Sequence, residues 1–148
     1  MVIAPACQAG DRGFDPRRSR KSHRKVAFFI PASREMLASP GEGRVLVVDG
    51  GASLRCALVG DMLALLAVDN GWAGVVVYGA IRDSRETGTM PLGLRALGTN
   101  PRRSLKSGQG ETQVPISIGE VTVAPAEWLY ADEDGIVISA IPLTAPRA

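Results

Sequence analysis

The chain has 148 residues, of which 45% are hydrophobic and 22% charged, and a formal net charge of +2. A chain of this length forms one or two domains and buries enough apolar surface for a core, which argues against a wholly disordered protein. The small net charge hides an asymmetry, because residues 1–43 contain eight basic and four acidic side chains and residues 44–148 contain nine and eleven.

Cysteine and histidine are scarce, which disfavours several classes of protein. Cys7 and Cys56 are too few and too far apart for a disulfide framework or a zinc ribbon, and they are typical of a reducing compartment. His23 is the single histidine, which argues against a Ser-His-Asp triad, a multi-histidine zinc site or a His-carboxylate iron site. No run approaches the 18 apolar residues of a membrane span, and no signal peptide pattern is present at the start. We therefore expect a cytoplasmic protein with no membrane partner.

The first quarter of the chain shows little regular pattern. Residues 1–25 are rich in Gly, Pro, Ser and Arg without a helix or strand period, which indicates a solvated, poorly ordered tail. A basic arm that contacts nucleic acid is the less favoured interpretation of the same residues. Residues 25–30 predict a short strand, and residues 33–37 predict a helical turn.

A regular α/β pattern follows. Residues 45–48 form a continuous apolar run closed by a turn at 49–51, which is typical of a buried strand. Residues 54–70 carry apolar side chains at helical spacing, but a glycine interrupts them, so the ordered helix is expected to begin at Asp61. Residues 74–79 predict a second buried strand, which completes a right-handed βαβ unit.

The C-terminal part changes character. Residues 98–111 predict a long polar loop. The alternating runs 114–118 and 121–123 predict a hairpin, and residues 128–138 predict a second hairpin-like pair around an Asp-Gly turn. Together these elements predict an α/β fold with a mixed sheet.

The predicted helix start is the first candidate site. It consists of four residues, Gly60, Asp61, Met62 and Leu63. Free backbone N–H groups at a helix start, together with the helix dipole, favour an anion such as a carboxylate or a phosphate. In the alternative interpretation, Asp61 simply caps the helix.

Arg82 and Asp83 form the second candidate site, directly after the second buried strand. In open α/β sheets, ligands bind just beyond the carboxyl ends of the strands. An arginine can bind a carboxylate through its forked guanidinium, and an aspartate can bind a hard cation. Glu86, three residues further on, is close enough to orient a metal-bound water. The alternatives are a surface ion pair for Arg82 and Asp83, and a solvated helix turn for Glu86.

These residues lie within a longer resemblance. The run GEGRVLVVDGGASLRCALVGDMLALLAVDNGWAGVVVYGAIRD, with the later ALGTNPRRS and LYADEDGIVIS, resembles the regulator of ribonuclease activity A family, which merges with the class II 4-hydroxy-4-methyl-2-oxoglutarate aldolases. The resemblance covers residues 41–139. It implies a compact mixed-sheet α/β/α sandwich that assembles as a homotrimer with its site at a subunit boundary.

One motif divides that family. Aldolases and oxaloacetate decarboxylases carry an acidic residue or a glycine, then twenty residues, Arg-Asp, two residues and an acid, whereas members known only as regulators tend to lose the Asp after the Arg. Here Asp61, Arg82, Asp83 and Glu86 reproduce the pattern. The resemblance implies that the backbone of residues 60–63 binds the pyruvyl carboxylate, that Arg82 binds keto or carboxylate oxygens, and that Asp83 binds Mg²⁺ or Mn²⁺.

The implied reaction is metal-dependent cleavage of a C–C bond in a 2-oxo acid with release of pyruvate. The metal and Arg82 would stabilise the developing enolate, and Asp61 would position the water that moves the proton. The alternative is a non-catalytic regulator that binds and inhibits an endoribonuclease. Asp83 and Glu86 favour the lyase, because a binding protein has no need of a metal ligand at that position. The motif does not identify the 2-oxo acid.

Residues 1–40 do not match the family as residues 41–148 do. The family begins with a helix and strands that complete the sheet, whereas this basic segment lacks a core-forming period. We therefore expect that it is poorly ordered or derives from a misassigned start or reading frame. If the segment is native, we expect the sheet to lack a partner strand and the trimer to be compromised.

Overall fold

The computed structural model describes residues 2–3, 25–29, 33–105 and 111–143. The predictions for the basic run and His23 fall outside these residues. In chain order, the elements are β1 (Val2–Ile3), β2 (Lys25–Phe29), α1 (Ser33–Leu37), β3 (Val45–Asp49), β4 (Ala57–Val59), α2 (Asp61–Asp69), β5 (Gly74–Ile81), α3 (Ser84–Thr87), β6 (Gly93–Thr99), β7 (Ile116–Ile118), β8 (Val121–Val123), β9 (Trp128–Ala131) and β10 (Ile136–Ser139).

A five-stranded parallel sheet forms the centre of the molecule. Its strands run in the order β2-β3-β5-β4, and β6 pairs with the other side of β5. β3 pairs with β5 from Val45↔Gly74 to Asp49↔Tyr78, and β4 continues along the same strand at Ala57↔Ala80 and Val59↔Ile81. The carboxyl ends of β4 and β5 therefore meet, and both lead into candidate site residues.

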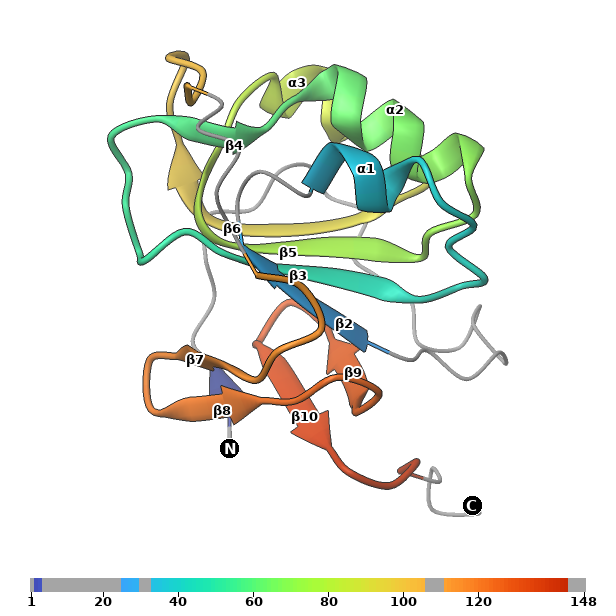
Figure 1. The fold of residues 1–148 in the computed structure, drawn as a ribbon. Helices are drawn as coiled ribbons and strands as arrows, with labels where there is room; N and C mark the ends of the chain where they lie inside the picture. The colour runs from blue at the N-terminus through green and yellow to red at the C-terminus, as the bar shows by residue number, and fades with distance from the viewer. Residues whose placement is uncertain (1, 4–24, 30–32, 106–110, 144–148) are drawn as a thin grey trace.

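Two different layers cover this sheet. The helices α1, α2 and α3 lie on one face, and strands β7 to β10 lie on the other (Figure 1). β7 and β8 form one antiparallel sheet, and β9 and β10 form another with β1. The predicted α/β fold is confirmed, with one difference from an α/β/α sandwich: the second layer in the described residues consists of strands. The expected mixed sheet is absent from the described residues, because the central sheet is entirely parallel and the antiparallel pairs form separate sheets.

Each layer shares a hydrophobic core with the central sheet. The core on the helical side is built around Leu46, Val75 and Leu94 of the sheet and Ala64 and Ala67 of α2. A second, separate core lies on the strand side of the sheet. It is formed by the buried residues Val45, Val47, Val76, Ile116, Ile118, Val123, Leu129, Ala131 and Ile136. Alternate residues of β3 thus face opposite cores, as the pleat of a strand covered on both faces requires.

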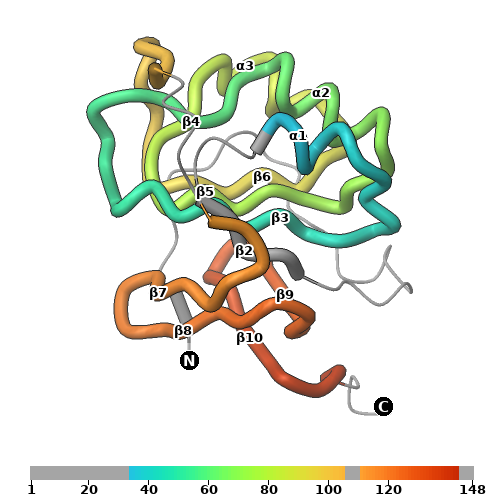
Figure 2. Tube along the Cα trace, in the orientation of Figure 1, coloured from blue at the N-terminus to red at the C-terminus, as the bar shows by residue number. Residues whose placement is uncertain are grey.

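Part of the first forty residues belongs to this architecture. β2 pairs with β3 from Lys25↔Val45 to Phe29↔Asp49, so the expectation that the sheet lacks a partner strand is wrong. α1 lies against α2 in the helical layer, as the tube in Figure 2 shows, and its Leu37 is fully buried. The indole of Trp72 donates a hydrogen bond to the carbonyl of Ser39 at 3.1 Å, which ties the end of this segment to the core.

Two elements differ from expectation. Residues 57–59 were expected within a helical pattern but form the short strand β4, because pairing with β5 satisfies their backbone groups. Residues 93–97 carried no prediction, and residues 98–99 were wrongly expected to begin the polar loop. Together they form β6, whose glycines and Arg95 interrupt the apolar run that identifies buried strands. None of the helices in the described ranges is long and apolar enough to cross a membrane.

The attachment of α1 to the core can be tested by substitution. Leu37→Ala should lower the free energy of unfolding by about 2 to 5 kcal/mol, because it leaves a cavity between α1 and the sheet. Arg34→Ala, at an exposed position of the same helix, is the matched control and should change it by about 0.5 kcal/mol or less. Urea unfolding followed by circular dichroism measures both. Equal midpoints for the two variants would show that α1 does not pack on the core.

Candidate functional site

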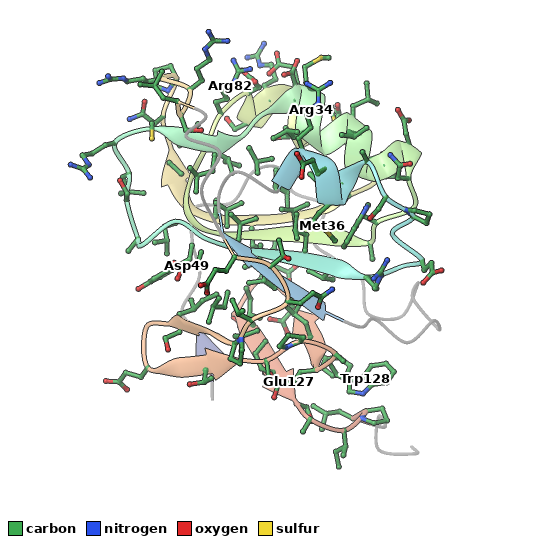
Figure 3. The ribbon with its side chains drawn as sticks, viewed as in Figure 1. Arg34, Met36, Asp49, Arg82, Glu127 and Trp128 are labelled. Atoms are coloured by element: carbon green, nitrogen blue, oxygen red, sulfur yellow. The ribbon has the colours of Figure 1, made fainter. Side chains whose placement is uncertain are left out.

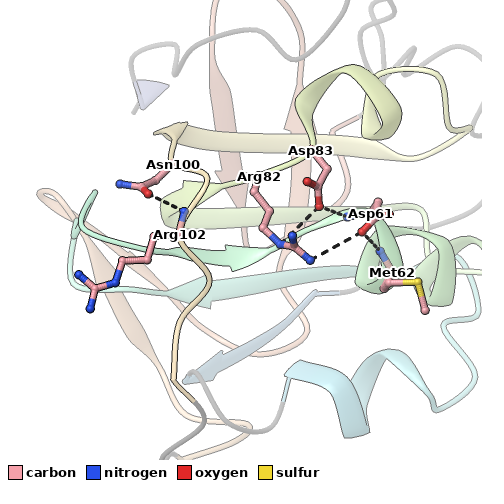
Figure 4. Close-up of polar contacts among 6 residues, drawn as sticks. All are labelled: Asp61, Met62, Arg82, Asp83, Asn100 and Arg102. Carbon is pink, nitrogen blue, oxygen red and sulfur yellow. Dashed lines mark hydrogen bonds and ion pairs between the residues drawn. The ribbon is translucent and has the colours of Figure 1, made fainter.

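The candidate site lies where β4 and β5 end beside each other. The backbone N–H of Arg82 donates to the carbonyl of Val59 at 2.9 Å, one residue before Gly60 begins the turn into α2. Two segments separated by about twenty residues of sequence thus become neighbours (Figure 4). Figure 3 places Arg82 on the helical side of the molecule, far from Glu127 and Trp128 in the strand layer.

The first amides of α2 are bound by carboxylates. The carbonyl of Gly60 accepts the N–H groups of Leu63 and Ala64 at 3.1 and 3.0 Å, which begins the helical ladder. The N–H of Asp61 donates to Oδ2 of Asp83 at 3.2 Å, and the N–H of Met62 donates to Oδ1 of Asp61 at 2.7 Å. The helix start therefore holds two carboxylate oxygens, as its free donors and its dipole favour.

Arg82 lies between the same two carboxylates. Its Nε is 3.4 Å from Oδ2 of Asp83, and its Nη2 is 3.9 Å from Oδ1 of Asp61. The exposed fractions of the three side chains are 36% for Arg82, 41% for Asp61 and 28% for Asp83. Ion pairs with this much solvent contact contribute little to stability. The three side chains therefore add little to the stability of the fold and remain accessible to solvent.

Gly60 leaves the space that this arrangement needs. A Cβ atom at Gly60 would lie 2.7 Å from Nε of Arg82 and 2.7 Å from Oδ2 of Asp83. The backbone of Gly60 is extended, with φ at −134°, which any residue can adopt. The requirement for glycine is thus one of space, because both charged side chains approach the helix start closely.

Asp83 has a backbone conformation that is uncommon for a residue with a side chain. It lies in the left-handed region, with φ 56° and ψ 41°, at the N-cap of α3. Aspartate at an N-cap usually bonds the first amides of its own helix, but Asp83 makes no such side-chain bond. Its carboxylate instead binds the first amide of α2. Strained backbone of this kind is common at functional sites.

The other predicted residues contribute less. The side chain of Met62 is 70% exposed and that of Leu63 packs against the core, so only their backbone groups face the helix start. Glu86 is exposed on α3, and its carboxylate makes no hydrogen bond or ion pair with another described residue. Its role as an orienting group stays a prediction.

The residues present fit only a cation site with a single protein ligand, in which water and substrate supply the other oxygens. No group of three or more His, Cys, Asp or Glu in the described ranges could hold a metal by itself. Asp83 uses Oδ2 for Asp61 and Arg82, and its Oδ1 accepts no hydrogen bond from the described part of the chain. One carboxylate oxygen suits a hard cation such as Mg²⁺, which keeps several waters and accepts further oxygens from its substrate.

Residues 100–104 border the site, although their sequence predicts only a polar loop without a role. The structure puts Asn100 beside the end of β5, where its N–H donates to the carbonyl of Ile81 at 2.8 Å. The Asn-Pro dipeptide at 100–101 is a turn signal that could have identified this corner.

The family model described as Aldolase/RraA (RraA-like) matches residues 25–138. The chain belongs to the RraA-like family. This confirms the resemblance inferred from the sequence and extends it toward the N-terminus, since the match begins at β2. A relative from Laribacter hongkongensis, named "Putative 4-hydroxy-4-methyl-2-oxoglutarate aldolase", is 62% identical over 110 residues, which cover 74% of this chain and 69% of the relative. A relative of the same name from Aromatoleum aromaticum is 58% identical over 106 residues, or 72% of this chain and 67% of the relative.

Solved structures agree on the fold of this RraA-like chain. The RNA-processing inhibitor RraA from Thermus thermophilis is 38% identical with a TM-score of 0.87, covering 100% of this chain and 90% of that one. A structure from Geobacillus kaustophilus, named S-adenosylmethionine: 2-dimethylmenaquinone methyltransferase, is 41% identical with a TM-score of 0.80, covering 86% and 81%. The names of these two structures differ, so the fold alone does not decide the chemistry of the RraA-like chain.

The space at Gly60 yields a direct test of the site. Gly60→Ala should displace Arg82 and Asp83, because a Cβ atom would fall within 2.7 Å of both side chains. The melting temperature should fall, because Cγ of Arg82 lies 2.9 Å from the Cβ position and must shift together with the two charged ends. The amide resonances of Asp61 and Asp83 in ¹H–¹⁵N spectra should shift.

Gly98→Ala is the matched control, because a Cβ atom there meets only the side chain of Leu54, at an ordinary contact of 3.4 Å. It should leave the Asp61 and Asp83 resonances in place. Unchanged resonances in Gly60→Ala would contradict the close approach of Arg82 and Asp83 to the helix start.

Proposed function

We propose that this chain is a lyase that cleaves a C–C bond of a 2-oxo acid and releases pyruvate, as a 4-hydroxy-4-methyl-2-oxoglutarate aldolase, an oxaloacetate decarboxylase or both. The observation that carries the proposal is the convergence of Arg82 and Asp83 on the first amides of α2. The names of relatives more than 50% identical to this chain give the same reaction class.

The helix start supplies a site for the carboxylate of the pyruvyl group. The N–H groups of Asp61 and Met62 already donate to carboxylate oxygens, so their directions suit an oxyanion. A substrate carboxylate would replace the protein oxygens on these donors, and the guanidinium of Arg82 would form a charge-assisted bond with it. Binding at this position leaves the keto oxygen near Arg82 and Asp83.

Arg82 would then act on the charge that develops during bond cleavage. The bond between C3 and C4 breaks, and its electron pair moves into the pyruvyl half to form an enolate with negative charge on the keto oxygen. A positively charged group held next to that oxygen stabilises the enolate more than the substrate, which lowers the barrier. Protonation at C3 then gives pyruvate, and the leaving half is CO₂ or a second 2-oxo acid.

Asp61 has the position of a group that handles water or a proton. Its carboxylate is 41% exposed, so solvent reaches it, and a substrate that takes the N–H of Met62 would release Oδ1 to bond a water. In the aldol reaction, the C4 hydroxyl must lose a proton as the bond breaks, and a carboxylate or a water beside it can accept that proton. We assign Asp61 to the positioning of this water.

Asp83 is the residue that would hold a divalent cation, Mg²⁺ or Mn²⁺, through its unengaged Oδ1. Such a cation, when bound, polarises the keto oxygen as a Lewis acid. Glu86, exposed on the next turn, would orient a water in its shell. The metal dependence of the reaction rests on this donor set and on the motif Asp61, Arg82-Asp83 and Glu86.

A homotrimer in the cytoplasm is part of the same proposal. α2 exposes 70% of Met62 and 47% of Leu65 beside the helix start, which is more apolar surface than a helix facing solvent usually carries. A second copy of the chain that covers this face would bury both side chains and place the site at a subunit boundary.

A second candidate function is inhibition of an endoribonuclease without catalysis. It is favoured by the likeness to the structure named RNA-processing inhibitor RraA, which covers the whole of this chain. The presence of Asp83 beside Arg82 favours the lyase, because inhibition by docking needs no cation ligand there.

An assay of pyruvate release from oxaloacetate and from 4-hydroxy-4-methyl-2-oxoglutarate tests the proposal. Release should require added Mg²⁺ or Mn²⁺, and kcat/KM should fall about 100-fold or more in Asp83→Ala. Asp69→Ala is the matched control, since this exposed aspartate lies at the opposite end of α2, and it should leave kcat/KM unchanged.

Turnover that persists in chelator and in Asp83→Ala would contradict the role of the cation. No turnover of either substrate, together with co-purification of an endoribonuclease, would decide for the inhibitor instead.

A further inference from the structure

Asn100 forms hydrogen bonds to three separate segments that border the site. Its backbone N–H donates to the carbonyl of Ile81 at 2.8 Å, directly before Arg82. Its side-chain Nδ2 donates to the carbonyl of Leu54 at 2.8 Å. Its Oδ1 accepts the N–H of Arg102 at 2.8 Å, as Figure 4 shows. The side chain thus uses both its donor and its acceptor, a combination that hydroxyl and carboxylate side chains do not reproduce in this geometry.

The bond to Arg102 fixes a short turn. An asparagine Oδ1 that accepts the N–H two residues later closes an Asx turn, and Pro101 between them has a restricted φ that favours the same turn. The turn places residues 102–104 alongside β4. There the N–H of Ala57 donates to the carbonyl of Arg102 at 2.6 Å, and the N–H of Ser104 donates to the carbonyl of Ala57 at 2.9 Å.

β4 depends on this second neighbour. It is only three residues long, and Ala57 pairs with Ala80 of β5 on one side and with Arg103 on the other. Without the turn at Asn100, the strand would be paired on one side only, through a register that already shifts between Ala57 and Val59. A strand of this length held from one side is poorly fixed.

The position of β4 in turn sets the position of the site. Val59 ends β4, and its carbonyl accepts the N–H of Arg82 at 2.9 Å. The next residue is Gly60, whose carbonyl begins the ladder of α2. A displacement of β4 therefore moves the helix-start amides and the backbone of Arg82 relative to each other.

We propose that Asn100 is a positioning residue of the active site: by closing the turn beside β4, it holds the amides of α2 and the guanidinium of Arg82 in the geometry that binds the substrate carboxylate. This inference rests on the proposed lyase function. Asn100 itself does not touch the substrate, and the guanidinium of Arg102 points away from Arg82 (Figure 4). A positioning error of about 1 Å can reduce the rate of an enzyme by about 100-fold.

The test compares Asn100→Ala with a matched control, Asn70→Ala. Asn70 also donates its Nδ2 to a backbone carbonyl, that of Leu66 at 2.9 Å, but it lies at the C-terminal end of α2. Below the melting temperatures of both variants, kcat/KM for metal-supported pyruvate release should fall about 10- to 100-fold in Asn100→Ala. It should stay within about twofold of wild type in Asn70→Ala. Equal losses in the two variants, or full activity in Asn100→Ala, would overturn the inference.

A second readout does not depend on activity. Hydrogen exchange of the Ala57 and Arg82 amides, followed by NMR, should become about tenfold faster in Asn100→Ala, whereas the amide of Val76 in the centre of β5 should be unaffected. If the wild type releases no pyruvate, the proposed function fails, and unchanged exchange at Ala57 and Arg82 separately overturns the positioning role.

Asn100→Asp identifies which side-chain bond matters. Aspartate keeps an acceptor for the N–H of Arg102 but loses the donor to the carbonyl of Leu54. Slow exchange at Ala57 and most of the kcat/KM should therefore return in this variant. Exchange and activity as poor as in Asn100→Ala would overturn the assignment of the effect to the turn.

Discussion

The site depends on one backbone hydrogen bond, the 2.9 Å contact from the N–H of Arg82 to the carbonyl of Val59. It joins the end of β5 to the end of β4 and so brings Arg82 and Asp83 to the first turn of α2. The parallel sheet makes this bond possible, because β4 takes over the side of β5 that β3 leaves after Tyr78. Ligand sites at the carboxyl ends of parallel strands arise from such changes of neighbour.

The charge distribution at this corner supports the proposal that it binds an anion. The free amides and the dipole of α2 attract negative charge, and Arg82 adds a positive charge beside them. The protein places its own carboxylates, Asp61 and Asp83, on these donors. These side chains remain partly exposed, as the proposed entry of a substrate carboxylate to the same donors requires.

Much of this arrangement could be predicted from sequence because it follows from local patterns. β3 and β5 are continuous apolar runs, α2 begins at Asp61 as expected, and the pairs β7-β8 and β9-β10 follow alternation and turn signals. Membership in the RraA-like family is also confirmed. The spacing between Asp61 and Arg82 identified two segments that the structure brings together.

The remainder depends on contacts between residues far apart in the chain. β4 was hidden within helical spacing, because three residues carry too little pattern to identify a strand. β6 is specified by pairing with β5 more than by its own residues. Asn100 bonds to Leu54, 46 positions away, a contact that no spacing rule indicates. β2 was expected as a short strand, but its place at the edge of the sheet follows only from its pairing with β3.

The most direct test of the central claim is a crystal structure of the chain with Mg²⁺ and oxalate, which mimics the enolate of pyruvate. We expect one oxalate carboxylate on the N–H groups of Asp61 and Met62, the guanidinium of Arg82 on the oxalate oxygens, and the cation on Asp83. Oxalate or Mg²⁺ bound elsewhere, with Asp61 and Asp83 still on the helix-start amides, would contradict the account.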